Sequence, residues 1–262
     1  MKIKNLLVVK IGGSTLGQHD TTMSDLVALQ KRGVPVVVIH GGGKIITEWL
    51  TKQSAPTKFV NGERVTDKIG LDVVTAVLAG LVNKELVATL MASGGKAMGL
   101  SGVDGALIQG KIKNQELGYV GNPVKINNEL LEILLKAGYM PVIASISLNM
   151  DEKSTGNPLL LNVNADTAAG EIAASMQAEK LVFLTDIAGI CDASGKVIGK
   201  MTVQEAEALV VSGVAAGGMI PKIRAGIRSL SQANSTRIID GRQPHALLNE
   251  IDKAEGGTTI YK

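Results

Sequence analysis

Short apolar runs alternate with helix-periodic stretches along most of this chain. Aliphatic runs bounded by glycine or polar residues are typical of buried strands, and they occur at 6–10, 34–40, 96–100, 140–145, 181–185, 236–240 and 257–261. Apolar residues at helical spacing lie between them, at 22–31, 44–52, 127–137, 168–176, 202–212 and 220–232. This alternation predicts an α/β fold, a three-layer αβα sandwich with a mainly parallel central sheet.

The pattern changes between residues 59 and 124. Asn61-Gly62 is the turn signal of a hairpin over 59–65, and Thr66-Asp67 offers caps for a long helix over 68–93. The segment 104–124, which is rich in glycine and polar residues, is expected to form hairpins and loops. Since no low-complexity linker follows, we expect one continuous sheet with an N-terminal lobe over 1–175 and a C-terminal lobe over 176–262.

Composition narrows the class of protein. Hydrophobic residues make up 45% of 262 residues and mean hydropathy is +0.22, which predicts a large core. Aromatic residues are only 2% and the net charge is +3 without a basic run, so nucleic-acid binding is not expected. The single cysteine, Cys191, allows no intrachain disulfide, and the sequence shows no leader and no run of membrane-spanning length. We therefore expect a soluble, cytoplasmic protein that binds no membrane.

Glycine loops next to lysines are the candidate phosphate sites. The sequence has neither the G-x-x-x-x-G-K-[ST] motif nor a G-x-G-x-x-G turn after a strand. Bare N–H groups at the end of a strand or the start of a helix bind anions, and a nearby lysine adds charge. The simpler interpretation is a tight strand-to-helix turn for Gly12-Gly13 and a flexible surface loop for Gly217-Gly218. The three candidates are Gly12-Gly13 with Lys10, Gly42-Gly43 with Lys44, and Gly217-Gly218 with Lys222.

Converging lysines repel one another, so a carboxylate is expected among them. Asp166, at the start of the alanine-rich helix, is the candidate, and its alternative role as a helix N-cap is compatible with this one. Arg64 follows the Asn-Gly turn and is either a clamp for a substrate carboxylate or a solvated hairpin side chain. His40 ends a buried strand and is interpreted as structural, because no metal-ligand spacing links it to the other histidines.

Taken together, these motifs resemble the acetylglutamate kinases of the amino acid kinase family, in the same order and over essentially the whole chain. The resemblance is carried by Lys10-Ile-Gly-Gly-Ser14, His40-Gly-Gly-Gly43, Phe59-Val-Asn-Gly-x-Arg-Val-Thr-Asp67, Ala79-Gly-Leu-Val-Asn-Lys84, Asn162-Val-Asn-Ala-Asp166, Thr185-Asp-Ile-Ala-Gly189 and Gly217-Gly-Met-x-Pro-Lys222. It implies the amino acid kinase fold with two lobes. It also implies ATP-dependent phosphorylation of the γ-carboxylate of N-acetyl-L-glutamate, the second step of arginine biosynthesis.

The resemblance also assigns roles to residues. Lys10 and Lys222 would stabilise the transferring phosphoryl group, with Asp166 holding both lysines in place. Acetylglutamate would be bound by Gly42, Gly43, Arg64 and Asn162, and Arg64 would take its α-carboxylate. The nucleotide and its phosphates would be contacted by Gly12, Gly13, Gly42, Thr185, Asp186, Gly217 and Gly218. Mg²⁺ would arrive with ATP, since the sequence shows no carboxylate cluster for a dedicated metal site.

Three features leave alternatives open. Glu63 stands before Arg64 where family members usually carry an apolar residue, so a sister kinase acting on an acylated or carrier-bound aminoadipate remains an alternative. The other alternative activity is that of a family member that binds nucleotide without catalysing a reaction.

The short stretch before the first strand lacks the N-terminal helix of hexameric, arginine-inhibited members, which favours a homodimer. Pro244–Leu248 and Glu255–Thr258 nevertheless resemble the arginine-sensitive members.

Overall fold

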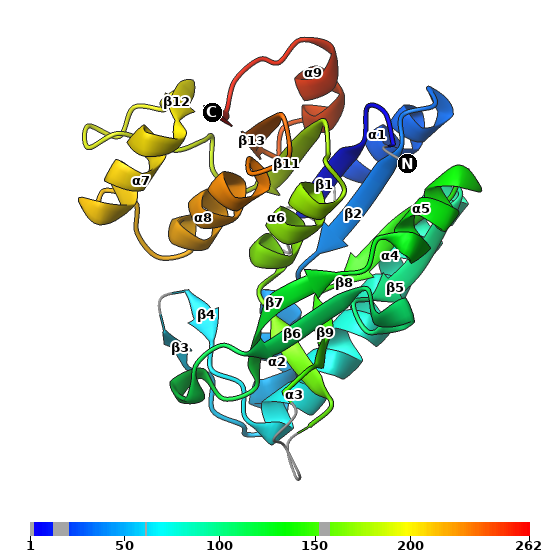
Figure 1. The fold of residues 1–262 in the computed structure, drawn as a ribbon, viewed down its shortest axis with the longest axis vertical. Coiled ribbons are helices and arrows are strands. Elements are labelled where there is room, and N and C mark those ends of the chain that lie inside the picture. The colour runs from blue at the N-terminus through cyan, green and yellow to red at the C-terminus, as the bar shows by residue number, and fades with distance from the viewer. Residues whose placement is uncertain (1–2, 13–20, 61, 152–157) are drawn as a thin grey trace.

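The chain folds around one large sheet with helices on both faces, in a computed structural model that describes residues 3–12, 21–60, 62–151 and 158–262. The sheet has eight strands in the order β12-β14-β13-β11-β1-β2-β8-β5 (Figure 1). Their bounds are β1 Leu7–Ile11, β2 Val36–His40, β5 Ala97–Ser101, β8 Met140–Ala144, β11 Lys180–Thr185, β12 Lys200–Thr202, β13 Ser235–Asp240 and β14 Thr258–Tyr261. Neighbouring strands in this sheet are parallel except β13 and β14, which confirms the predicted mainly parallel architecture.

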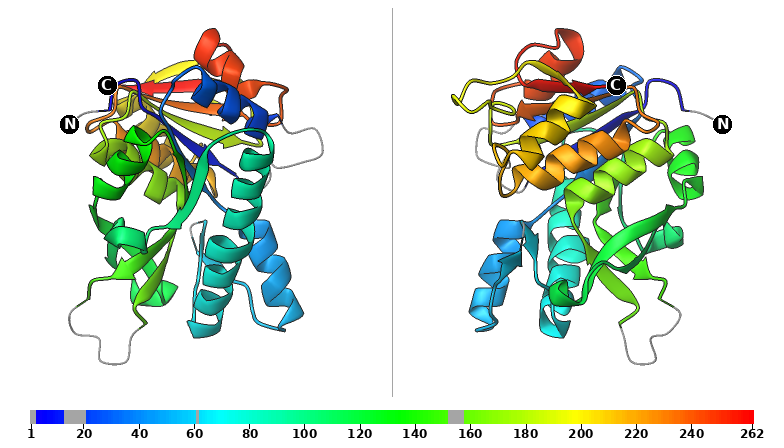
Figure 2. Two further views of the ribbon diagram at one scale, coloured as in Figure 1. Left: turned by 90° about the vertical axis from the view of Figure 1, so that its right-hand side faces the viewer. Right: turned by 60° about the vertical axis from the view of Figure 1, so that its left-hand side comes forward.

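Helices cover both faces of the sheet, as Figure 2 shows from two further sides, and a hydrophobic layer packs against each face. One face packs against α5, α6, α7 and α8, and the other against α1, the long helix after residue 67 and α9. The helix bounds are α1 Thr22–Lys31, α2 Gly43–Lys52, α5 Glu129–Lys136, α6 Ala165–Ser175, α7 Val203–Val211, α8 Met219–Ser229 and α9 Ala246–Asp252. Side chains alternate between these faces along each strand, so residues two positions apart on a strand pack in the same layer.

The long helix predicted over 68–93 is interrupted by a wider turn. It consists of α3 Lys68–Thr75, a π-helical segment Ala76–Val82 and α4 Asn83–Ala92, with the Asp67 side chain capping its first turn. Its apolar spacing fits either helix type, so the sequence did not reveal the π-helical segment. By length and composition this helix resembles a membrane span, but 44% of its most apolar window is buried, and it packs as a core helix.

A second, smaller sheet closes on itself below the main one. Strands β6 Ile108–Ile112, β7 Val120–Ile126, β9 Ile146–Asn149 and β10 Leu160–Val163 form a closed barrel in the order β10-β7-β6-β9. Residues 104–124 were expected to form hairpins and loops. The expected hairpin is present as β6 and β7, and its outer edges also pair with β9 and β10 from later in the chain, which was not expected. The predicted hairpin at 59–65 is present as β3 Phe59–Val60 and β4 Glu63–Arg64.

The carboxyl ends of the central strands define where a ligand can enter. From β1 the sheet continues to β2 on one side and to β11 on the other, so the strand order reverses at β1. In open α/β sheets such a reversal leaves a crevice outside the strand ends, and ligands bind there. The glycine turn after β2 and the start of α6 both lie at this edge, beside the barrel and the β3–β4 hairpin (Figure 1).

Candidate functional site

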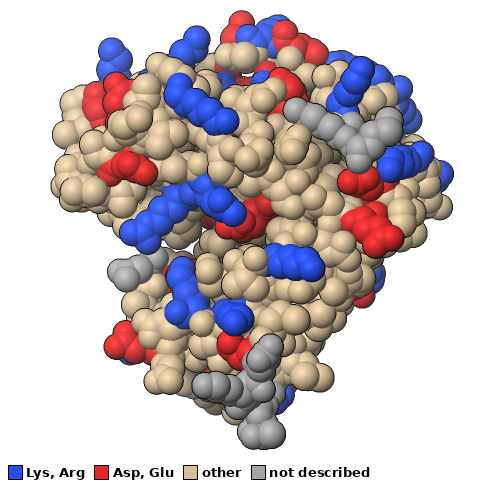
Figure 3. Space-filling view, viewed as in Figure 1, with Lys and Arg blue, Asp and Glu red and all other residues tan. Residues whose placement is uncertain are grey.

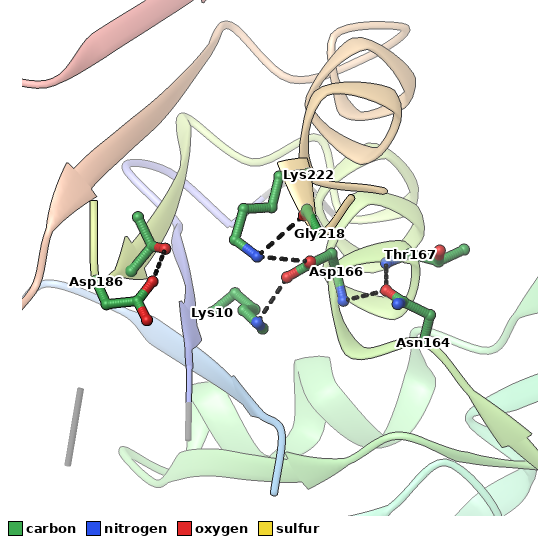
Figure 4. A network of polar contacts seen from close by, with 8 residues as sticks. Lys10, Asn164, Asp166, Thr167, Asp186, Gly218 and Lys222 are labelled. Carbon is green, nitrogen blue, oxygen red and sulfur yellow. Dashed lines mark hydrogen bonds and ion pairs between the residues drawn. The ribbon is translucent and has the colours of Figure 1, made fainter. Parts of the chain in front are cut away.

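Asp166 joins the two lysines that the sequence predicted to converge. Its Oδ1 atom lies 2.6 Å from Lys10 Nζ and its Oδ2 atom lies 3.1 Å from Lys222 Nζ. Figure 4 shows the carboxylate between the two ammonium groups, with one oxygen for each. The exposed fractions of the Lys10, Asp166 and Lys222 side chains are 9%, 6% and 16%. Two cations and one anion therefore meet where solvent is largely excluded, which leaves a net positive charge for an anionic ligand.

Strand parity and helix packing explain this meeting. Lys10 lies two positions after Val8 on β1 and therefore on the same face of the sheet, and Val8 packs in the layer that contains α6. Asp166 occupies the first turn of α6, and Lys222 lies in the first turns of α8, the helix packed against α6. Asn164, and not Asp166, caps α6, because its side chain accepts hydrogen bonds from the backbone N–H groups of Asp166 and Thr167. The Asp166 carboxylate is thereby left for the lysines.

The charge state of Asp166 follows from two opposing effects. Burial alone raises the pKa of this carboxyl group. The charges of Lys10 and Lys222 and their hydrogen bonds act in the opposite direction and outweigh burial, so the pKa lies below its usual value. Asp166 is consequently ionised at neutral pH and serves as the counter-ion of both lysines.

The glycine turn after β2 rests on the π-helical segment. A Cβ atom on Gly42 would lie 2.7 Å from Leu78 Cδ2, so a larger residue would force this side chain to move. Five residues after Leu78, Asn83 donates to Nε2 of the fully buried His40 at 3.1 Å. Residues five apart stack in a π-helix, whereas in an α-helix they point about 140° apart. The π-helical segment therefore supports the turn and His40 from one side.

His40 is neutral and fixes the first carbonyl of the glycine turn. Burial, together with the nearby charges of Lys10 and Lys84, lowers its pKa to about 4, although the hydrogen bond to Gly41 acts in the opposite direction. Because the Asn83 amide nitrogen can only donate, Nε2 accepts and the proton resides on Nδ1, which donates to the Gly41 carbonyl at 3.1 Å. This supports the interpretation of His40 as a structural residue and specifies what it holds.

Arg64 is buried with part of its guanidinium unpaired. Its NH2 group donates to Gly43 O at 3.0 Å and to Thr47 Oγ1 at 2.8 Å, and the Phe59 ring lies 4.7 Å from its Cζ atom. The NH1 group is buried without a hydrogen-bond partner, and burial lowers the pKa of the side chain. Buried donors are normally satisfied, so this group marks a place for an acceptor.

Lys10, Asp166 and Arg64 line one cavity of ≈ 170 Å³, which we call the central cavity. Figure 3 shows Lys and Arg side chains on both sides of a hollow in this face of the molecule. Asn162 borders the cavity from β10, and its Nδ2 atom donates to Thr66 Oγ1 at 3.0 Å. The site residues expected from the sequence that line the central cavity are Lys10, Gly42, Gly43, Arg64, Asn162 and Asp166.

Gly217 and Gly218 precede α8 and face the β3–β4 hairpin. A Cβ atom on Gly62 would lie 3.2 Å from Gly217 O, and Gly62 has a φ of +81°. The backbones of the hairpin and of the loop before α8 therefore approach without an intervening side chain. Lys222 Nζ also lies 3.4 Å from Gly218 O, which keeps the lysine next to this loop (Figure 4).

The remaining residues expected to bind nucleotide lie at neighbouring strand ends, outside the lining of the central cavity. Thr185 ends β11, the strand paired with β1, and its hydroxyl lies 3.3 Å from Asp186 Oδ1 (Figure 4). The Gly12 N–H donates to Leu184 O at 3.2 Å, so in this structure it is engaged in the sheet. Gly13 lies outside the described residues.

A model of the amino acid kinase family matches residues 5–240. The chain belongs to the amino acid kinase family. It is 46% identical over 256 residues to an acetylglutamate kinase from Dehalococcoides mccartyi, covering 98% of this chain and 94% of that one. It is 42% identical over 261 residues to an acetylglutamate kinase from Cereibacter sphaeroides, with coverages of 98% and 87%. N-acetylglutamate synthase from Neisseria gonorrhoeae, solved with coenzyme A and N-acetyl-glutamate, superimposes with a TM-score of 0.84 at 26% identity. That match covers 98% of this chain and 59% of the synthase.

This amino acid kinase offers no cluster of three or more His, Cys, Asp or Glu side chains within the part of the chain that the structure describes. The donor set near the central cavity is instead one carboxylate already paired with two lysines. Such a site suits an anion better than a resident cation. A divalent ion that keeps most of its water ligands and is carried by phosphate oxygens fits these surroundings.

Sequence reasoning missed several residues that shape the site of this amino acid kinase. Thr47 and Phe59 hold Arg64, Ser145 borders the central cavity, and Asn83 holds His40. Asn83 carried a usable signal, because it is a polar residue within an otherwise apolar helix face. The others had none, since their partners come from distant segments.

Proposed function

We propose that this chain is an acetylglutamate kinase, which transfers the γ-phosphoryl group of ATP to the γ-carboxylate of N-acetyl-L-glutamate. The observation that carries the proposal is the Lys10–Asp166–Lys222 arrangement, because Lys10 and Asp166 line the same cavity as Arg64, whose NH1 group is unpaired. Relatives at 42–46% identity with that activity in their names support it. The reaction is the second step of arginine biosynthesis.

The proposed chemistry needs charge stabilisation and no general base. A carboxylate oxygen of the substrate, already ionised at neutral pH, forms a bond to the γ-phosphorus as the bond to the bridging oxygen of ADP breaks. Charge spreads over the equatorial phosphoryl oxygens in the transition state, and Lys10 and Lys222 stabilise it there. Asp166 orients the two lysines and limits their mutual repulsion. Mg²⁺ enters with ATP and neutralises part of the phosphate charge.

Recognition of acetylglutamate, a dicarboxylate, is assigned to the residues of the central cavity other than Lys10 and Asp166. Arg64 NH1 donates to the α-carboxylate, a charge-assisted hydrogen bond that satisfies the buried donor. Gly42 and Gly43 contact the substrate through their backbone, and Asn162 through its side-chain amide. Each of these residues lines the cavity, so a single ligand of this size can reach all four.

ATP is assigned to the C-terminal lobe, residues 176–262, and acetylglutamate to the N-terminal lobe, residues 1–175. In this proposal Thr185 and Asp186 line the nucleotide site and the backbone of Gly12, Gly13, Gly217 and Gly218 contacts phosphate oxygens. The position of Gly217 and Gly218 before α8 supports this, because helix N-termini attract phosphate.

A homodimer is proposed as the assembly, in the cytoplasm. Strand β5 is an edge of the large sheet, and α4 beside it exposes Met91, half of whose surface is accessible. An edge strand next to exposed apolar side chains is a natural surface for pairing with a second copy. Light scattering that reports the 27.3 kDa mass of one chain at micromolar concentration would contradict the dimer.

A hydroxamate assay with ATP and Mg²⁺ tests the activity, since hydroxylamine traps acyl phosphates. Acetylglutamate, glutamate and N-acetylaminoadipate are compared at equal concentrations. We expect product with acetylglutamate at a rate at least ten times that with the others. A preference for N-acetylaminoadipate would assign the chain to a sister kinase, and the absence of product with all three would indicate a non-catalytic nucleotide-binding protein.

A further inference from the structure

Glu63 places a negative charge beside the residue assigned to the substrate α-carboxylate. It forms the two-residue strand β4 together with Arg64, and both residues line the central cavity. The Glu63 side chain is only 11% exposed. A carboxylate that is poorly solvated and close to the ligand site opposes the binding of a dianion.

Lys113 pairs with this carboxylate from outside the central cavity. Its Nζ atom lies 2.5 Å from Glu63 Oε2, and the lysine side chain is 37% exposed. Lys113 directly follows β6 in the barrel, where its backbone N–H donates to Val120 O at 2.8 Å. Lys113 is absent from the cavity lining, so it does not touch the ligand and acts on it by its charge alone.

We propose that Lys113 is a positioning residue for acetylglutamate: it neutralises Glu63 and so leaves the charge of Arg64 unopposed for the substrate α-carboxylate. The inference rests on the proposed function, because it takes the ligand to be a dicarboxylate. It also accounts for a carboxylate at position 63 in a site that must attract an anion. The Glu63–Lys113 pair adds no net charge to the site.

The direction in which three variants change the Kd and KM for acetylglutamate tests this mechanism. Lys113→Met leaves Glu63 unneutralised, so the Kd and KM for acetylglutamate rise about five- to tenfold. Glu63→Gln leaves Lys113 positive, so both constants fall about two- to threefold. The double variant removes both charges and returns the constants to within about twofold of the parent protein. If the pair were only a strap for the hairpin, both single variants and the double variant would raise the constants.

Lys68→Met is the matched control. Lys68 also lies 2.5 Å from a carboxylate, Asp72, but both partners are more than 60% exposed and neither lines the central cavity. Its Kd for acetylglutamate should be unchanged. Lys113→Arg, which keeps the charge, should also bind within about twofold of the parent, and a weakening there would overturn the charge mechanism.

Isothermal calorimetry with acetylglutamate and with its α-carboxamide analogue provides the deciding measurement. The effect of Lys113→Met should be strong for acetylglutamate, at most twofold for the analogue without the α-carboxylate, and reduced by added salt. Equal effects on both ligands, or no effect on either, would overturn the inference. A parent protein that binds acetylglutamate without turnover would refute the proposed activity and leave this comparison intact. A parent protein that binds no acetylglutamate would overturn both.

Discussion

The amide of Asn83 donates a hydrogen bond to Nε2 of His40, 43 positions earlier in the chain, and both side chains are fully buried. The same amide nitrogen lies 2.9 Å from Val142 O. An oxygen in its place would face that carbonyl at an unfavourable distance, so the amide has one acceptable orientation. The tautomer of His40, and with it the direction of the Gly41 carbonyl, follows from a helix on the opposite side of the sheet from Asp166.

Asn83→Leu should therefore weaken both the fold and the site. The substitution leaves the His40 ring nitrogen and the Val142 carbonyl without their donor, which costs about 2 kcal/mol of unfolding free energy. Urea unfolding measures this loss, and a steady-state assay should show a lower kcat because the glycine turn is no longer held. Asn234→Leu, which removes an exposed hydrogen bond to Glu179, is the control and should change stability by less than about 0.5 kcal/mol. Equal losses in the two variants would contradict the role of Asn83.

His40 should make stability depend on pH between about 6.5 and 4. Its folded-state pKa is about 4, below the unfolded value of 6.5, so the folded protein disfavours the protonated ring. Its stabilising contribution is complete above pH 6.5 and is lost as pH falls towards 4, about 3 kcal/mol in total. The variant His40→Gln lacks this titration. Urea unfolding at pH 7, 5.5 and 4 should therefore show a shallower decline for the variant, and parallel declines would rule out the buried neutral histidine.

Loss of either lysine should mainly affect the chemical step. Lys10→Ala and Lys222→Ala should each lower kcat by two to three orders of magnitude, about the effect of removing one donor from a charged transition state. Lys136→Ala on α5 removes a lysine from a surface pair with Glu132 and serves as the control, with kcat unchanged. Near-native turnover by either site variant would contradict the proposed mechanism.

Asp166→Asn should cost stability as well as rate. A neutral side chain leaves Lys10 and Lys222 without their counter-ion, so we expect about 3 kcal/mol lower unfolding free energy and a kcat reduced about tenfold or more. Because the Asp166 pKa is lowered by folding, its contribution is complete above the unfolded value near 4 and is lost as pH falls below it. The stability difference between parent and variant should shrink below pH 4. A difference that stays constant down to pH 2 would contradict this.

Gly62→Ala should disturb the approach between the hairpin and the loop before α8. The new methyl group would lie 3.2 Å from Gly217 O at a backbone φ of +81°. Gly138 has a similar φ of +77° with nothing within 4 Å, so Gly138→Ala reproduces the backbone strain without the contact. We expect the KM for acetylglutamate to rise severalfold in Gly62→Ala and to stay unchanged in Gly138→Ala. Identical KM values in the two variants would show that the close approach of residue 62 to Gly217 O does not affect substrate binding.

The sequence predicted the main sheet well because buried parallel strands are continuous apolar runs. Helix α1 and strand β2 lie within two residues of their predicted bounds, and α7 begins at the Thr202–Glu205 capping box, within one residue of its predicted start. Helix α6 begins at Ala165 and not at residue 168, since Asn164 takes the capping role. The polar residues Asn162, Asn164, Asp166 and Thr167 interrupt the apolar spacing there, so the sequence did not reveal the true start of the helix.

Features that depend on distant partners were not predictable. The barrel pairs β6 with β9 in parallel across the intervening α5 and β8, and no local pattern encodes such a pairing. Helix α9 is short, and its N-cap residue, His245, has a left-handed backbone and makes no side-chain capping hydrogen bond, so the helix lacks the usual capping signals. Within the site, the lysines and Asp166 could be named from their positions, but the contact between Lys113 and Glu63 depends on how the barrel and the hairpin pack.

The polar contacts of Asn83 also reach the border of the sheet. Its amide nitrogen lies 3.3 Å from Leu100 O on β5, and Gly99 next to it has no side chain that would displace the amide. Three hydrogen bonds thus connect the edge strand to the glycine turn: Leu100 to Asn83, Asn83 to His40, and His40 to Gly41. A second subunit docked along β5 would touch one end of this chain of contacts, while the glycine turn after β2 forms the other end. Communication between the two sites of a dimer would then require no domain motion, only a shift of one buried amide.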